Sequence, residues 1–138
     1  MNTPMLLAIL ALVCGGITAF FSKVAGVNQG YSPSYMIVQA ISFVMFAVVI
    51  HIVQRHPFEL TGKLASFGLV SGIFAGVATL ATLVAFRQGG QGSIIFPIVG
   101  LGVIVSVTLS FLIYSEPITS TKLVGIGFGI ASIVFLSR

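Results

Sequence analysis

The sequence predicts an all-α polytopic membrane protein with five transmembrane helices, and three observations carry this prediction. Hydrophobic residues make up 57% of the 138 residues, and the mean hydropathy is +1.19, far above what a soluble domain exposes. The chain has only six Lys or Arg and two Asp or Glu residues. Apart from Lys122, these charges lie outside or at the ends of five long apolar runs, as expected when the solvent is lipid.

The first three runs predict spans over residues 3–22, 34–53 and 64–86. The first contains Pro4 near its start, where a missing N–H costs little, and ends before Lys23. The second follows Ser32-Pro33 and ends in the polar cluster Gln54-Arg55-His56-Pro57. The third stops at Arg87, where a glycine-rich turn over residues 88–92 lets the chain reverse.

The last two runs predict spans over residues 93–114 and 119–137. Pro97 lies within the first turns of the fourth span, and Ser115-Glu116-Pro117 closes it. Lys122 lies inside the fifth window, and we expect its long side chain to reach the interface. Because these five spans with short connections use the whole chain, we expect residues 1–138 to form a single five-helix transmembrane domain.

Positive charges are balanced between the two predicted sides of the membrane. Five spans put Arg55, Lys63 and Lys122 on the side of the N-terminus, and they put Lys23, Arg87 and Arg138 on the other. Orientation follows the asymmetry of Lys and Arg in short loops. The tie leaves two hypotheses open: insertion in both orientations, or a single orientation with the N-terminus inside.

Each span carries a stripe of small or polar residues when side chains are placed at helical intervals. Gln39 is the most demanding of them, because a primary amide in hydrocarbon needs hydrogen-bond partners or a wet cavity. Tyr35 shares its stripe. The candidate substrate-path residues are Thr18, Tyr35, Gln39, Ser42, Thr79 and Thr82.

The glycine-rich part of these stripes favours helix packing instead, because small residues let two backbones approach closely in lipid. The glycines of the third span are expected to pack helices, while the stripes of the first three spans are expected to line the path and those of the fourth and fifth spans to face a partner. The packing or dimer candidates are Gly68, Gly72, Gly76, Gly102, Ser106, Ser110, Gly125 and Gly129.

The sequence gives no support for an enzyme, a cofactor site, a metal site or nucleic-acid binding. Both histidines, His51 and His56, lie at one span end. Cys14 is the single cysteine, so a cysteine metal cluster is not possible. No nucleophile, base and orienting group can plausibly converge. The basic excess comes from residues that flank the membrane.

Five short segments resemble a known family. Residues 85–97 (AFRQGGQGSIIFP), followed by residues 112–117 (LIYSEP) and Gly125-Ile126-Gly127, resemble the third-to-fifth-helix region of EamA-type members of the drug/metabolite transporter superfamily. Gly15-Gly16 with residues 20–23 (FFSK) resembles the family's first helix. The chain lacks the membrane glutamate of the related four-helix multidrug exporters, so the resemblance does not imply drug/proton antiport.

The resemblance implies one EamA-like repeat, which is half of the usual ten-helix protein. It therefore implies a half-size transporter that moves a small-molecule metabolite across a bacterial or archaeal plasma membrane by alternating access. The implied assembly is a homodimer, antiparallel or parallel, or a pair with a paralogue. Inverted repeats would place the substrate between the halves. Two alternatives stay open: a membrane accessory or structural subunit that does not transport, and a component of a flippase for a lipid-linked sugar.

Overall fold

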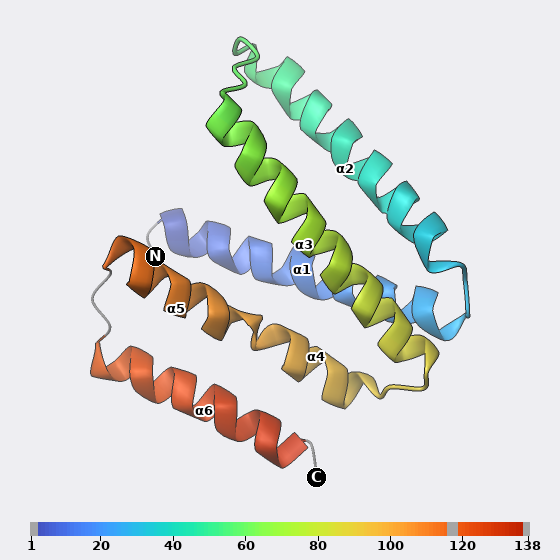
Figure 1. The fold of residues 1–138 in the computed structure, drawn as a ribbon, viewed down its shortest axis with the longest axis vertical. Coiled ribbons are helices and arrows are strands. Elements are labelled where there is room, and N and C mark those ends of the chain that lie inside the picture. Colours follow the sequence, from blue (N-terminus) through green and yellow to red (C-terminus); the bar gives the residue numbers. More distant parts are fainter. Residues whose placement is uncertain (1–2, 116–118, 137–138) are drawn as a thin grey trace. The chain divides into compact units, whose positions relative to one another are not determined.

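The computed structural model describes residues 3–115 and 119–136, without the side chains of Lys122, Ile133 and Leu136. The described residues form six α-helices and no strand (Figure 1). They are α1 (Thr3–Val27), α2 (Ser32–Gln54), α3 (Gly62–Arg87), α4 (Gly92–Gly100), α5 (Gly102–Tyr114) and α6 (Ser120–Leu136). The chain divides into two compact units, Met1–Gln88 and Gly89–Arg138.

Four helical segments of the described residues are long and apolar enough to cross a membrane. They are α1, α2, α3 and the stretch Gly92–Tyr114, which comprises α4 and α5. The prediction of an all-α polytopic membrane protein is therefore confirmed. The fifth predicted span corresponds to α6, whose 17 residues lie at the lower end of the length that spans a bilayer. Glu116 and Arg138, used in the sequence argument, lie outside the described residues.

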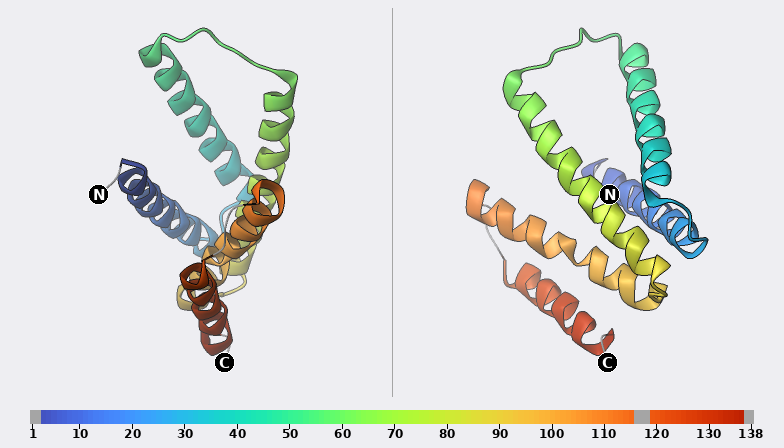
Figure 2. Two further views of the ribbon diagram at one scale, coloured as in Figure 1. Left: turned by 90° about the vertical axis from the view of Figure 1, so that its left-hand side faces the viewer. Right: turned by 45° about the vertical axis from the view of Figure 1, so that its right-hand side comes forward.

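In the first unit, α3 packs against both α1 and α2. The α2 and α3 helices lie close together at the end nearer α1 and diverge toward the loop that connects them (Figure 2). Leu83 and Phe86 on α3 are the buried apolar side chains among the described residues. The packing centre of this unit is therefore the C-terminal part of α3, where α1 meets it.

The α1 helix extends past the predicted end at residue 22 and continues through Val27. Within this extension Gly26 lies directly against α3, because a Cβ built there would lie only 2.7 Å from Cβ of Phe86 and 2.8 Å from the carbonyl oxygen of Leu83. A residue without a side chain lets the two helices touch. The helix then ends where the side-chain Nδ2 of Asn28 donates to the Val24 carbonyl at 2.8 Å.

In the second unit, the predicted fourth span is broken into α4 and α5 at Leu101. Pro97 has no N–H to donate to the preceding turn, and Gly100 and Gly102 flank the break. The Leu101 N–H lies 3.1 Å from the Pro97 carbonyl oxygen and 3.2 Å from that of Ile98, so the helix tightens at this point. The proline is visible in the sequence, but the sequence does not predict that the helix breaks four residues after it.

The α6 helix packs against α4 within this second unit. A Cβ built on Gly129 would lie 2.9 Å from Cδ2 of Leu101, so the residue at the helix break contacts the glycine stripe of α6. Ser115, which ends α5, has a φ of 52°, in the left-handed region that a residue with a side chain adopts at a cost of about 1–2 kcal/mol. In the turn at the start of this unit, Gly89 has a φ of 87°, which glycine adopts without strain.

Candidate functional site

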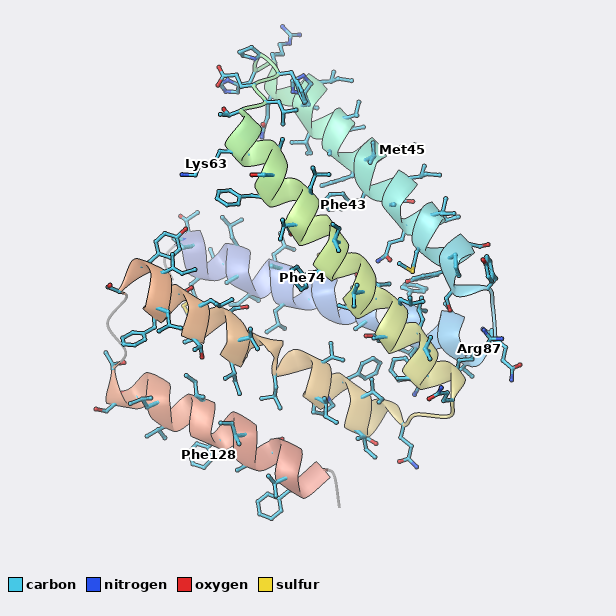
Figure 3. The ribbon with its side chains drawn as sticks, viewed as in Figure 1. Phe43, Met45, Lys63, Phe74, Arg87 and Phe128 are labelled. Carbon is cyan, nitrogen blue, oxygen red and sulfur yellow. The ribbon has the colours of Figure 1, made fainter. Side chains whose placement is uncertain are left out.

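A groove of about 620 Å³ lies between α2 and α3 in the first unit, within the usual size range of small-molecule sites. Its α2 wall consists of Met36, Gln39, Ala40, Phe43 and Val44, and its α3 wall consists of Gly68, Ser71, Gly72, Ala75, Gly76 and Thr79. Figure 3 shows Phe43 on the side of α2 that faces α3. The groove combines apolar walls with three uncharged polar side chains.

These three polar side chains, Gln39, Ser71 and Thr79, have no hydrogen-bond partner among the described residues. Gln39 and Thr79 are half-buried. Polar groups in hydrocarbon that lack a partner are costly, so a ligand, water or another protein segment must satisfy them. The groove can therefore accept hydrogen bonds from, and donate them to, a bound molecule.

Other hydroxyls of the predicted substrate path are satisfied by their own helices. Thr82 Oγ1 donates to the Ala78 carbonyl at 2.8 Å, Ser42 Oγ donates to Val38 at 3.0 Å, and Thr18 Oγ1 donates to Cys14 at 3.0 Å. Such bonds remove the demand for an external partner. None of these three residues lines the groove.

Tyr35 belongs to a different contact. Its hydroxyl lies 3.4 Å from Ser22 Oγ, and Ser22 Oγ also donates to the Thr18 carbonyl at 3.1 Å. This polar contact joins α1 to α2, and Ser22 is buried. Of the six candidate path residues, the groove thus brings together Gln39 and Thr79, while Tyr35 joins two helices beside it.

Sequence reasoning missed Ser71, Met36 and Phe43 as groove residues. Ser71 lies three positions after Gly68 and eight before Thr79, and such spacings bring residues to neighbouring positions on one side of a helix. Its signal was therefore present in the periodicity of α3. Met36 and Phe43 gave no such signal, because an apolar residue in a lipid-facing helix looks the same whether it faces lipid or a groove.

The glycines of α3 leave space in this structure. A Cβ on Gly68 or Gly72 would meet nothing within 4 Å, and one on Gly76 would meet Met36 Cε at 3.8 Å. Within the first unit these glycines widen the groove. Close helix contact is made instead by Gly26, which lies beyond the predicted end of the first span at residue 22.

Two of the candidates in the second unit line a smaller, apolar groove, and the others are not among its lining residues. Gly125 and Gly129 border a groove of about 330 Å³ together with Leu101, Val103, Ile104, Val107 and Ile126. A Cβ on Gly102 would meet nothing within 4 Å. Ser106 Oγ lies 3.4 Å from the Gly102 carbonyl oxygen, and Ser110 is half-buried. This groove offers no polar side chain among its lining residues.

Charged groups lie at the helix ends of the first unit. Lys63, at the start of α3, has its Nζ 5.9 Å from the centroid of the Phe67 ring, and Figure 3 shows it pointing away from α2. Beyond the end of α2, the Phe58 ring meets the His51 ring edge-on at 5.8 Å. Among residues 3–115 and 119–136, no group of three His, Cys, Asp or Glu could hold a metal ion.

Comparison with known proteins covers almost the whole chain. Residues 2–138 match the EamA-like transporter family. The chain is also similar to an uncharacterised protein of Methanocaldococcus jannaschii, with 26% identity over 137 residues, which is 99% of this chain and 98% of that protein. No solved structure matches. Four helical segments of this chain are long and apolar enough to span a membrane, and residues 2–138 match the family. The chain therefore belongs to the EamA-like transporter family of membrane proteins.

Proposed function

We propose that this chain is one half of a transporter, which moves a small metabolite across a bacterial or archaeal plasma membrane by alternating access. In this proposal α6 completes a fifth span, and residues 1–138 act as a single five-helix domain equivalent to one EamA-like repeat. Family membership supports the transport class. A relative of nearly the same length, of which this chain covers 98%, supports a unit of this size.

The α2/α3 groove is the observation that carries the proposal. It has the volume of a small-molecule site, and its half-buried Gln39 and Thr79 lack partners among the described residues. An amide retained in a membrane helix is costly unless it serves a site. We infer that Gln39 and Thr79 contact substrate, with Tyr35 beside the entrance. Thr18, Ser42 and Thr82 would contribute only after their helix hydrogen bonds are exchanged.

One five-helix repeat is half of an inverted pair, and in this proposal a second chain supplies the other half. We infer a homodimer, antiparallel if the balanced charges permit both orientations, with a paralogue as the alternative partner. The substrate would bind between the two halves, as in transporters built from inverted repeats. Gly102, Ser106, Ser110 and Gly125 would face the partner, since small residues suit helix association in lipid. Gly129 lies against Leu101 of the same chain and would support this surface from within.

Uptake by the purified chain in proteoliposomes tests this proposal against a role as an accessory subunit. Amino acids, sugars and cationic dyes form the substrate panel, and cross-linking in the liposomes reports the oligomeric state. Gln39→Leu should assemble normally, because it removes a polar demand, but it should reduce flux about tenfold, as expected for the loss of one hydrogen bond to substrate.

Met45→Leu is the matched control, since Met45 is an exposed α2 residue that does not line the groove. It should keep full flux. Absence of flux for every member of the panel, from a chain that assembles normally, would instead favour the accessory role. Normal flux from Gln39→Leu would remove this residue from the path.

A further inference from the structure

The walls of the α2/α3 groove are suited to the apolar part of a ligand. Met36, Phe43 and Val44 contribute apolar surface from α2. On the opposite side, Gly68 and Gly72 leave open space, because a Cβ on either would meet nothing within 4 Å. Burial of an alkyl or ring group against these side chains is favourable in proportion to the area removed from water.

The polar groups of the groove are all neutral. The amide of Gln39 can donate and accept, and the hydroxyls of Ser71 and Thr79 can do both. None of them has a hydrogen-bond partner within the described residues. These groups match a ligand that carries hydroxyl or amide functions.

Charged side chains of the first unit are absent from the groove lining. Lys23 lies near the end of α1, Arg55 and Glu59 in the loop after α2, and Lys63 and Arg87 at the two ends of α3. A charged ligand in the groove would therefore lose its hydration without gaining a counter-charge, which is costly in a membrane.

We propose that the α2/α3 groove binds an uncharged amphipathic molecule, with an apolar body against Met36, Phe43 and Val44 and a hydroxyl or amide group at Gln39, Ser71 and Thr79. This inference rests on the proposed function, because it names the substrate class of the same groove. It excludes organic anions and cations of the same size as ligands of that groove.

Three matched probes test the ligand class. Butyl glucoside is neutral, butyl glucuronide carries a carboxylate, and butyl 2-amino-2-deoxyglucoside carries an ammonium group, on nearly the same skeleton. Saturable binding of the radiolabelled probes to the full chain in phosphatidylcholine nanodiscs is measured, with empty nanodiscs subtracted. We expect the neutral glucoside to bind at least about tenfold more tightly than either charged probe, because neither charge finds a counter-ion.

Substitutions then locate the binding. Gln39→Leu and Thr79→Val should each weaken binding of the glucoside, roughly tenfold for the amide and less for the hydroxyl. Thr108→Val is the matched control for the hydroxyl, since Thr108 Oγ1 donates to its own helix at Ile104 with a distance of 2.8 Å. Gln39→Glu should favour the ammonium probe near neutral pH, where the amino group of this probe still carries its proton.

Equal binding of the neutral and charged probes would overturn the proposal, and so would the absence of saturable glucoside binding. Glucoside binding that neither Gln39→Leu nor Thr79→Val weakens would also overturn it. Binding of the neutral probe without any flux in proteoliposomes would support the ligand class while rejecting transport. Failure of the ligand class and failure of the transport proposal are therefore distinguishable.

Discussion

Gly26 on α1 lies against Phe86 on α3, so close that a Cβ built on the glycine would be 2.7 Å from Cβ of Phe86. The obstructing atoms are Cβ of Phe86 and the carbonyl oxygen of Leu83, the latter at 2.8 Å. Neither atom can move unless the α3 backbone moves. Phe86 and Leu83 are each 1% exposed. This contact is therefore the tightest constraint on the packing of α1 and α3.

Gly26→Ala should destabilise the protein by about 1–3 kcal/mol, because overpacking forces backbone shifts. Gly15→Ala provides the matched control on the same helix, since a Cβ there would meet nothing within 4 Å. It should be neutral or stabilising by up to roughly 1 kcal/mol through helix propensity. Thermal unfolding in detergent measures both. Equal melting temperatures for the two variants would contradict the close contact.

Gly129→Ala should cost less than Gly26→Ala, although a Cβ there would lie 2.9 Å from a neighbour. That neighbour is Cδ2 of Leu101, the end of a flexible side chain, which can rotate away at a cost of about 1 kcal/mol. The same melting experiment tests this order. Leu101→Ala combined with Gly129→Ala should remove the clash, so adding Gly129→Ala to Leu101→Ala should not lower the melting temperature further. A further decrease would show that another group obstructs α6.

Gly72→Leu should block the α2/α3 groove, since Gly72 lines it and has open space at its Cβ position. We expect flux to fall about tenfold or more, because the new side chain occupies the space of a ligand. Val77→Leu adds bulk to an exposed residue of the same helix outside the groove lining and should be tolerated. Cross-linking in liposomes adds a second readout: loss of the dimer in Gly72→Leu alone would make this glycine a packing residue.

Reporter fusions at the two ends of the chain should reveal mixed or easily shifted orientation. Arg55 and Lys63 flank the loop between α2 and α3, and the predicted lysine and arginine counts on the two sides are equal. Two lysines added between Pro57 and Thr61 should hold this loop, and the N-terminus with it, in the cytoplasm. The matched control adds two glutamates, which contribute little to orientation. A single orientation that ignores the added lysines would reject dual topology.

The sequence by itself determined which segments are helical and apolar. Long apolar runs bounded by charges and turn residues predict membrane helices. In lipid a backbone must hydrogen-bond its own N–H and C=O groups, and a helix does so within one segment. The four spanning segments follow from this local rule. Gln39 was also identifiable from sequence, because the cost of an amide in hydrocarbon is a property of the residue itself.

Only the tertiary structure decided which members of a stripe share a groove. Thr79 and Thr82 look alike in sequence, but Thr82 donates to Ala78 at 2.8 Å while Thr79 lines the α2/α3 groove. Gly26 and Gly72 differ in the same way, as one contacts α3 and the other faces open space. Helical periodicity places residues on a face, but the distance to the opposing helix depends on where two backbones cross, which involves residues far apart in the chain.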